Sequence, residues 1–272
     1  MASIATDIKK SKKTKNRTYV YILLLVLIFG GIIFIRNSYD DYGRQYGVGP
    51  KPDRILLSWA ADPSTSMAVT WRCRMGAGQG KVQITKSSKG PDLAKNACEI
   101  VAKKNILTTT YWPAYYYSVN IKELEPETTY AYRVGHERQW SEWNYFTTAS
   151  NENKPFSFIF MGDIQNDIRN RWSRVVRKAY SDASDAAFIL YLGDIVSKCK
   201  DAEWGQWFYA TGFIHKMIPC IATPGNHEYY KGKLCKHWKK IFKFPKNGPK
   251  GLKNTTYYID YQDVRIISLD SN

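Results

Sequence analysis

Apolar runs that end in a glycine turn occur three times in the second half of the chain. Residues 158–161, 188–192 and 218–224 are each short, and each is followed directly by glycine and a polar residue. Short apolar runs bounded by turn residues, with helical stretches between them, predict buried parallel strands in an α/β layer. The carboxyl ends of such strands meet at one edge of the sheet, where binding and catalysis are usually found.

Two amphipathic stretches lie between these predicted strands. Residues 168–180 and residues 204–214 carry apolar side chains at roughly helical spacing. The polar residues that follow the three strands, Asp163, Asp194 and Asn226, are separated by similar intervals. Each interval is close to the length of one strand–helix–strand unit, about 30 residues.

The first half of the chain shows a different pattern, in which short β-like segments are separated by turns. Met67, Val69 and Trp71 alternate with smaller or polar residues, so we expect Trp71 to point into a core. Seven such segments over about 100 residues predict a β-sandwich. They cover residues 54–59, 67–73, 81–85, 106–109, 115–121, 129–134 and 144–147.

The longest apolar run, residues 19–35, contains no charged residue. As a helix it would span about 25 Å, near the lower limit for crossing a bilayer. The basic residues that precede it are Lys9, Lys10, Lys12, Lys13, Lys15 and Arg17, and fewer follow it. This asymmetry predicts a transmembrane signal anchor with a cytoplasmic amino terminus and extracytoplasmic domains. A cleaved signal peptide is the alternative, although the run is long and no Ala-x-Ala site follows it.

Three polar motifs stand at the ends of the predicted parallel strands. They are Gly162-Asp163-Ile164-Gln165, Gly193-Asp194-Ile195-Val196 and Gly225-Asn226-His227-Glu228. A single Gly-Asp pair usually marks a turn or a helix cap. Carboxylate and amide oxygens delivered together to one sheet edge instead suit divalent or trivalent metals. The ordered set therefore predicts a metal site.

In this order the motifs resemble those of the calcineurin-like metallophosphoesterases, and most closely the purple acid phosphatase branch. Residues 124–132, Leu-Glu-Pro-Glu-Thr-Thr-Tyr-Ala-Tyr, resemble the tyrosine corner of fibronectin type III domains, and a domain of that type precedes the catalytic domain in this branch. The resemblance implies an all-β sandwich followed by an α/β metallophosphoesterase domain of four layers, α/β/β/α. The expected organisation is a basic tail (1–18), an anchor (19–35), a linker (36–52), the sandwich (53–149) and the phosphoesterase domain (155–272).

The resemblance also implies a role for each motif residue. Asp163 would hold one metal, Asp194 would bridge two metals, and Asn226 would hold the second. His227 would bind the substrate phosphate and protonate the leaving alkoxide. Two ions, whether iron, zinc or manganese, would clamp a phosphomonoester, lower the pKa of a bound water and stabilise the developing charge.

Two positions depart from the purple acid phosphatase pattern. Ser197 stands where the purple enzymes have a tyrosine that binds ferric iron, so a ferric-tyrosinate site is not expected and iron is not assumed. Gln165 stands where many metallophosphoesterases have a histidine ligand and the purple branch has glycine. Contact with substrate or with metal-bound water is one role open to Gln165, and a purely structural role is the alternative.

The family pattern also includes two later histidine motifs, which this sequence does not contain. The remaining histidines are His136 in the sandwich, His215 on a predicted helix and His237 in a lysine-rich segment, and we expect all three to be structural. The sequence is therefore interpreted as an incomplete family member, which is a fragment, an interrupted reading frame or a pseudoenzyme, with absent or severely impaired catalysis. The alternative from another class is a non-catalytic, membrane-anchored binding or adhesion protein.

The net charge of +16 is concentrated in two places, the amino-terminal tail and residues 231–253. The second segment carries nine lysines and no acid. It could form a basic rim that attracts phosphate esters, or a solvated lysine loop. No aromatic-interleaved, groove-reading module is present, so no specific nucleic-acid partner is expected.

Five cysteines in an exported chain permit disulfides and leave at least one thiol unpaired within the chain. Cys73 with Cys98, and Cys199 with Cys235, are possible pairs. Cys220 lies inside an apolar strand, and we expect it to be a buried thiol.

Overall fold

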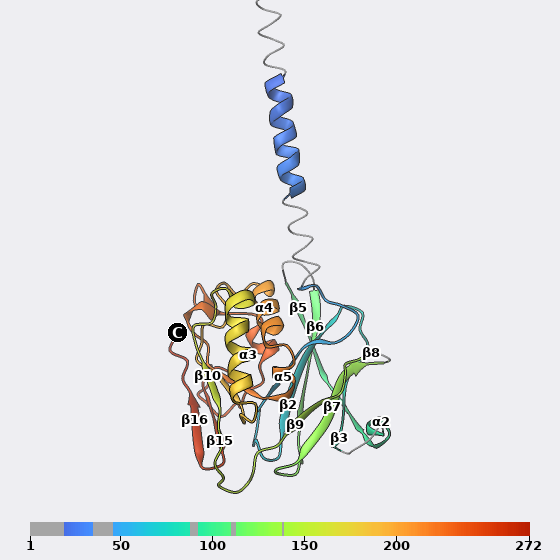
Figure 1. Ribbon diagram of the computed structural model, residues 1–272, viewed down its shortest axis with the longest axis vertical. Helices are drawn as coiled ribbons and strands as arrows, with labels where there is room; N and C mark the ends of the chain where they lie inside the picture. The colour runs from blue at the N-terminus through green and yellow to red at the C-terminus, as the bar shows by residue number, and fades with distance from the viewer. Residues whose placement is uncertain (1–18, 35–45, 88–91, 110–112, 138) are drawn as a thin grey trace, which may run out of the picture. The chain divides into compact units, whose positions relative to one another are not determined.

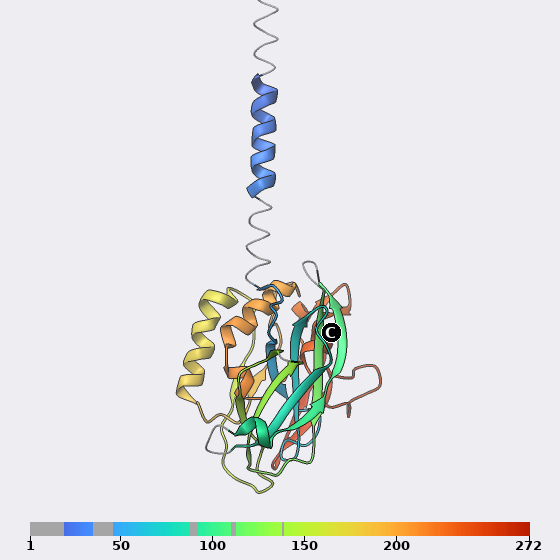
Figure 2. The ribbon, with the colours of Figure 1, turned by 90° about the vertical axis from the view of Figure 1, so that its right-hand side faces the viewer.

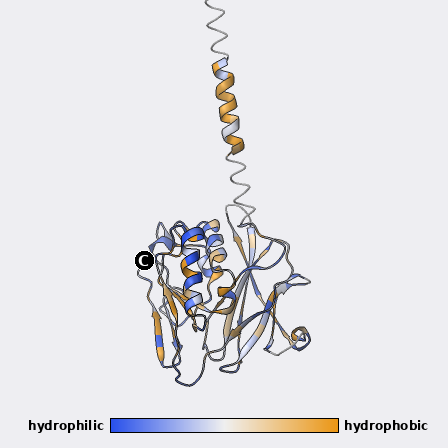
Figure 3. Cartoon of the chain, in the orientation of Figure 1, coloured by the Kyte–Doolittle hydropathy of each residue, from blue (hydrophilic) through white to orange (hydrophobic). Residues whose placement is uncertain are grey.

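The computed structural model describes residues 19–34, 46–87, 92–109, 113–137 and 139–272. Residues 19–34 are helical, and their large apolar side chains are exposed (Figures 1 and 3). Within the described residues, no helix has both the length and the apolar content needed to cross a bilayer. The transmembrane anchor predicted over residues 19–35 is therefore not supported, and the basic tail lies outside the described residues. The predicted cellular location stays a prediction.

The β-sandwich consists of two sheets, and every one of the seven predicted segments forms a strand. One sheet contains β1 (Asp53–Ser58), β2 (Met67–Arg74), β6 (Pro113–Ile121) and β5 (Lys103–Thr108). The other contains β4 (Cys98–Val101), β3 (Gly80–Lys86), β7 (Thr129–His136) and β8 (Gln139–Trp140), with β9 (Asn144–Thr147) paired to β7. A short helix, α2 (Leu93–Asn96), precedes β4. The sequence pattern missed β4 because most of its residues are exposed, so no apolar alternation marks it.

The core of the sandwich is aromatic. Trp71 is fully buried, as predicted, and its ring stacks on Tyr117 with 5.4 Å between the ring centroids. The hydroxyl of Tyr130 accepts a hydrogen bond of 2.9 Å from the backbone N–H of Glu125. This bond joins the strand β7 to the turn before it, so the predicted tyrosine corner is confirmed.

The α/β half, residues 155–272, is built on three short parallel strands in the predicted order. These are β10 (Ile159–Met161), β11 (Ile189–Tyr191) and β12 (Cys220–Ala222). The helical elements are the π-helix η1 (Ile168–Trp172), α3 (Ser173–Asp182), α4 (Asp201–Thr211), α5 (Ile214–Met217), the 3-10 helix η2 (Asn226–Glu228) and α6 (Trp238–Ile241). Two hairpins complete this half: β13 (Tyr229–Tyr230) with β14 (Lys233–Leu234), and β15 (Tyr257–Tyr261) with β16 (Val264–Ser268).

Different elements cover the two faces of these parallel strands. Helices α3 and α4 lie together on one side (Figures 1 and 2), where Tyr191 of β11 meets Trp172 and Trp207. On the other side, Tyr261 of β15 packs on Phe188 with 5.3 Å between ring centroids. The hydroxyl of Tyr257 donates a 2.7 Å hydrogen bond to the carbonyl of Ala222. In the described residues, the layer opposite the helices is thus the β15–β16 hairpin.

The two halves share one sheet. Strand β12 pairs in parallel with β1, with Ser58 opposite Cys220, which gives a seven-stranded sheet in the order β10-β11-β12-β1-β2-β6-β5. Side chains of the sandwich also bond to backbone of the α/β half: Thr70 Oγ1 donates to the carbonyl of Ile241 at 2.6 Å, and the Tyr132 hydroxyl to that of Lys216 at 2.7 Å. The halves therefore form a continuous structure.

Several large apolar side chains of the α/β half stay exposed. Phe160 on the edge strand β10 is 65% exposed and Ile267 on β16 is 61% exposed. Phe158, Leu192 and Leu269 are also exposed. In Figure 3 most of β16 has the colour of hydrophobic residues.

Candidate metal centre

The loops that follow β10, β11 and β12 are bonded to one another. The backbone N–H of Asp163 donates to the carbonyl of Gly193 at 3.3 Å, and that of Ile164 to the carbonyl of Asp194 at 3.0 Å. The third loop joins them through the backbone N–H of His227, which donates to Asp194 Oδ1 at 2.9 Å. All three motifs therefore meet at one edge of the sheet.

The glycines of these motifs allow the loops to approach so closely. Gly193 has φ +89°, and a Cβ added there would lie 2.8 Å from the backbone nitrogen of Gly225. A Cβ at Gly225 would overlap the carboxylate of Asp194. Asp163 and Asp194 themselves have φ of 55° and 51°, in the left-handed region that is uncommon for residues other than glycine. Such backbone strain in the first two loops is typical of functional sites.

Glu228 fastens the second loop to the third, a role that sequence reasoning missed. Its fully buried carboxylate accepts backbone hydrogen bonds from Asp194, Ile195 and Gly225 at 2.9 Å, and from Val196 at 3.1 Å. Burial raises the pKa of this carboxyl, while the backbone donors act in the opposite direction. The only signal in the sequence was an acid directly after the histidine of the third motif.

His227 is held in one orientation by the second loop. Its Nδ1 lies 2.9 Å from the carbonyl oxygen of Ser197. Since a carbonyl only accepts, Nδ1 carries the hydrogen of that bond. Within the described residues Nε2 makes no hydrogen bond. Ser197, which stands where the purple enzymes have a tyrosine, thus contributes its backbone carbonyl to the site.

The side chains that could hold metal are oxygen donors with little other bonding. Neither the carboxylate of Asp163 nor the amide of Asn226 is hydrogen-bonded or ion-paired to any described residue, and both residues are exposed. Asp194 gives one oxygen to the N–H of His227. Gln165 has a buried Oε1 without a hydrogen-bond partner. This donor chemistry fits a hard divalent or trivalent cation.

The described part of the chain contains no group of three or more histidine, cysteine, aspartate or glutamate residues arranged to hold a metal ion. Two histidines outside the loops have structural partners instead, as predicted. His215 is fully buried with Nε2 2.7 Å from the Tyr191 hydroxyl, and burial lowers its pKa to about 3. His237 has Nε2 3.1 Å from Asp201 Oδ1. The oxygen donors available in the three motifs are thus the carboxylates of Asp163 and Asp194 and the amides of Gln165 and Asn226.

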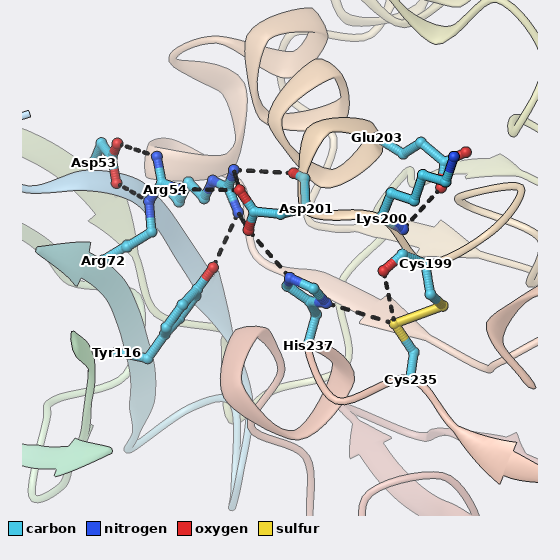
Figure 4. Close-up of polar contacts among 10 residues, drawn as sticks. All are labelled: Asp53, Arg54, Arg72, Tyr116, Cys199, Lys200, Asp201, Glu203, Cys235 and His237. Carbon is cyan, nitrogen blue, oxygen red and sulfur yellow. Dashed lines mark hydrogen bonds and ion pairs between the residues drawn. A yellow bond between two sulfur atoms is a disulfide. The ribbon is translucent and has the colours of Figure 1, made fainter. Parts of the chain in front are cut away.

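A disulfide between Cys199 and Cys235 lies next to these loops (Figure 4). It joins the segment after the second motif to the segment after the third, and the backbone N–H of Cys235 donates to the carbonyl of Glu228 at 2.8 Å. This predicted pair is confirmed. The pair Cys73 with Cys98 is wrong: both are free thiols, on strands β2 and β4 of different sheets.

A buried ion network anchors the start of α4 to the sandwich (Figure 4). Asp201 accepts from Arg54 at 2.8 Å, and the two side chains are only 8% and 3% exposed. Arg72 pairs with Asp53 at 2.6 Å and also approaches Asp201 at 3.4 Å. Burial opposes ionisation of Asp201, but His237 and Arg54 hold its pKa well below the usual range. The helix that follows the second motif is thereby fixed to strands β1 and β2.

Family models account for both halves of the chain. Residues 156–270 match the model described as calcineurin-like phosphoesterase, in agreement with the fold and the three loops. Residues 52–148 match the model described as purple acid phosphatase, N-terminal domain. The chain thus resembles the calcineurin-like metallophosphoesterases in its α/β half and the purple acid phosphatases in its sandwich half.

One curated relative and one solved structure place this assignment among known proteins. "Probable inactive purple acid phosphatase 1" of Arabidopsis thaliana is 22% identical over 227 residues, which cover 75% of this chain and 35% of the relative. The solved "Structure of PhoD" has a TM-score of 0.60 at 14% identity and covers 83% of this chain and 53% of that one. At that identity the likeness shows the fold alone. The chain spans about a third of the curated relative's length.

Proposed function

We propose that this chain carries the site of a metal-dependent phosphoesterase that hydrolyses phosphomonoesters at a dinuclear centre. The observation that supports this most strongly is the joining of three strand-end loops through Asp194 and Glu228. The Glu228 carboxylate accepts hydrogen bonds from four backbone N–H groups of these loops and so holds two of the loops in a single arrangement. A site that must hold cations at fixed positions needs such a rigid support.

The ligand roles in this proposal follow the donors at the sheet edge. Asp163 would hold one ion, Asp194 would bridge both, and Asn226 would hold the second, with iron, zinc or manganese as the candidates. When bound, the ions would supply Lewis acidity toward the phosphate and lower the pKa of a bound water. Gln165 would use its unpartnered Oε1 to accept a hydrogen bond from that water or from the substrate.

His227 would act as the general acid. The Ser197 carbonyl fixes the hydrogen on Nδ1, so the proton that can be exchanged sits on Nε2. A protonated Nε2 would bind a phosphate oxygen and then pass its proton to the leaving alkoxide. The backbone N–H of His227 meanwhile donates to Asp194 Oδ1.

A second candidate function is binding of metal or phosphate without turnover. It is favoured by the small number of protein donors in the described residues and by the word "inactive" in the name of the Arabidopsis relative. Under this proposal the chain would be a pseudoenzyme or a binding protein. The sheet-edge loops would then retain their structure and lose only the chemistry.

Metal analysis and turnover of the full-length chain separate the two candidates. The protein is loaded with zinc, manganese or iron and assayed with para-nitrophenyl phosphate from acidic to alkaline pH. The variants are Asp194→Ala and His227→Ala, with Asp185→Ala as a matched control on an exposed acid away from the loops. Turnover that His227→Ala abolishes without loss of metal supports the esterase.

Metal binding that disappears only in Asp194→Ala, with no turnover by the wild type, supports the second candidate. Equal metal content in the wild-type chain, Asp194→Ala and Asp185→Ala would remove the basis of both proposals.

A further inference from the structure

Four lysines of the lysine-rich segment do not gather at the sheet-edge loops. Together with Lys103 of β5, they line a separate cavity of about 570 Å³, which is called the lysine cavity below. The four are Lys239, Lys243, Lys246 and Lys253. The cavity lies against β5 and β6, at the opposite end of the seven-stranded sheet from β10. Its lining includes none of the candidate metal ligands.

The charge in the lysine cavity is not compensated by the described residues. No acid lines it, and none of its five lysines forms an ion pair with a described carboxylate. Lys243 is half-buried, and its Nζ reaches only the carbonyl of Lys239, at 3.4 Å. Burial lowers the pKa of Lys243, and the neighbouring Lys103, Lys240 and Lys246 lower it further. The other four lysines are exposed, and a bound anion would relieve the repulsion among the five cations.

One residue that lines the same cavity, Asn254, carries an unpaired amide donor. The Nδ2 of Asn254 is buried and has no hydrogen-bond partner. Its orientation is fixed, because Oδ1 of the same side chain accepts a 2.9 Å bond from the backbone N–H of Phe244. The backbone carbonyl of Asn254 is also engaged, by Nε1 of Trp238 at 2.9 Å. A buried donor without an acceptor is costly, and a bound oxyanion would supply that acceptor.

We propose that the lysine cavity binds a small, multiply charged oxyanion. Its phosphate or sulfate groups would lie among the five ammonium groups, and Asn254 Nδ2 would donate one hydrogen bond to it. The cavity volume falls within the usual range for small-molecule sites, about 300–1,000 Å³. This proposal does not depend on the activity of the sheet-edge loops.

The first experiment titrates the full-length chain with inorganic triphosphate in a calorimeter. The double variant Lys239→Gln with Lys243→Gln removes two cavity charges. The matched control, Lys236→Gln with Lys250→Gln, removes two exposed charges from the same segment outside the cavity. Loss of two charge-assisted contacts should weaken binding at least tenfold, and the control should weaken it less than twofold. Equal weakening by both pairs would show general charge attraction and overturn the proposal.

A second pair of variants tests the location of the ligand. Asn254→Asp is nearly isosteric and suits the residue's left-handed φ of 74°, but it turns the donor into an anion. It should lower triphosphate affinity about tenfold. Asp194→Ala, at the sheet-edge loops, should leave the triphosphate affinity unchanged. A lower affinity in this variant would show that triphosphate binds at the loops, and would overturn the proposal.

The same titration with sucrose octasulfate in place of triphosphate shows whether the cavity prefers sulfate or phosphate groups. Binding of either probe that is lost in the Lys239→Gln, Lys243→Gln chain supports the oxyanion site and identifies its group. Failure of both probes to bind the wild-type chain overturns it.

Discussion

Strand β2 of the sandwich and strand β10 of the α/β half are both apolar, yet their surroundings differ greatly. Seven of the eight residues of β2 are buried, because the strand lies between β1 and β6 and is covered on both faces. Strand β10 forms the edge of the same sheet, and its Phe160 is 65% exposed. The two halves thus use one sheet for different ends. In the sandwich half the sheet is part of a buried aromatic core. In the α/β half it carries the strained loops and leaves some apolar side chains exposed.

The most severe test of this contrast is truncation of one aromatic side chain in each half. Trp71→Ala should lower the free energy of unfolding by about 4 kcal/mol, because it leaves a cavity against Tyr117. Phe160→Ala should change it by no more than about 0.5 kcal/mol, because most of that ring is in water. Urea denaturation followed by circular dichroism measures both. Equal losses would show that the edge of the α/β half is as well packed as the sandwich.

The next largest effect is expected at the disulfide of the α/β half. Its cysteines are 36 residues apart in sequence, and removing a cross-link of that span should cost about 3–4 kcal/mol. The variant is Cys199→Ser with Cys235→Ser, and Cys98→Ser, which changes an exposed free thiol of the sandwich, is the control. Thermal unfolding gives the loss of stability. Hydrogen exchange should rise at Ile195 and Val196, whose N–H groups are held by Glu228. Unchanged protection at these two amides would show that the disulfide does not stabilise the loops.

Acid should weaken the α/β half through His215. Burial lowers the pKa of this histidine from 6.5 to about 3, so between these values the unfolded chain binds more protons than the folded one. Stability contributed by the neutral imidazole is full above pH 6.5 and is lost as the pH falls toward 3. The loss should reach about 2 kcal/mol at pH 5.

His215→Gln keeps a polar side chain beside Tyr191 but does not titrate. Urea midpoints of this variant should change less with pH over the same interval than those of the wild-type chain. An identical slope in both proteins would assign the acid sensitivity to other groups.

The smallest change in stability is expected from polar substitutions on the exposed apolar residues. Phe160→Ser with Ile267→Ser should leave the unfolding midpoint nearly unchanged and reduce self-association, because exposed apolar surface favours aggregation. Light scattering against protein concentration provides the measurement. The matched pair Lys236→Ser with Lys250→Ser changes exposed polar positions and should not reduce scattering.

Local patterns predicted most of the strands but not how distant strands pair. The alternation around Trp71 and the apolar runs before Asp163 and Asp194 depend on each residue's near neighbours, and the structure confirms the strands that they predicted. The pairing of β1 with β12 and the contacts of Glu228 depend on residues far apart in sequence. No period in the sequence encodes such contacts. The lysine cavity was hidden for the same reason, since Lys103 joins the later lysines only after folding.

The pairing of β1 with β12 sets a condition on how a ribosome can deliver this chain. Strand β1 is synthesised early, but its partner β12 comes much later in the sequence, since Ser58 lies opposite Cys220. Until that distant segment has left the exit tunnel, β1 presents an unpaired edge that other chains could join. Contacts of such separation form late because a long loop must close first. The first strand of the newly made sandwich is therefore covered only after the α/β half has been synthesised.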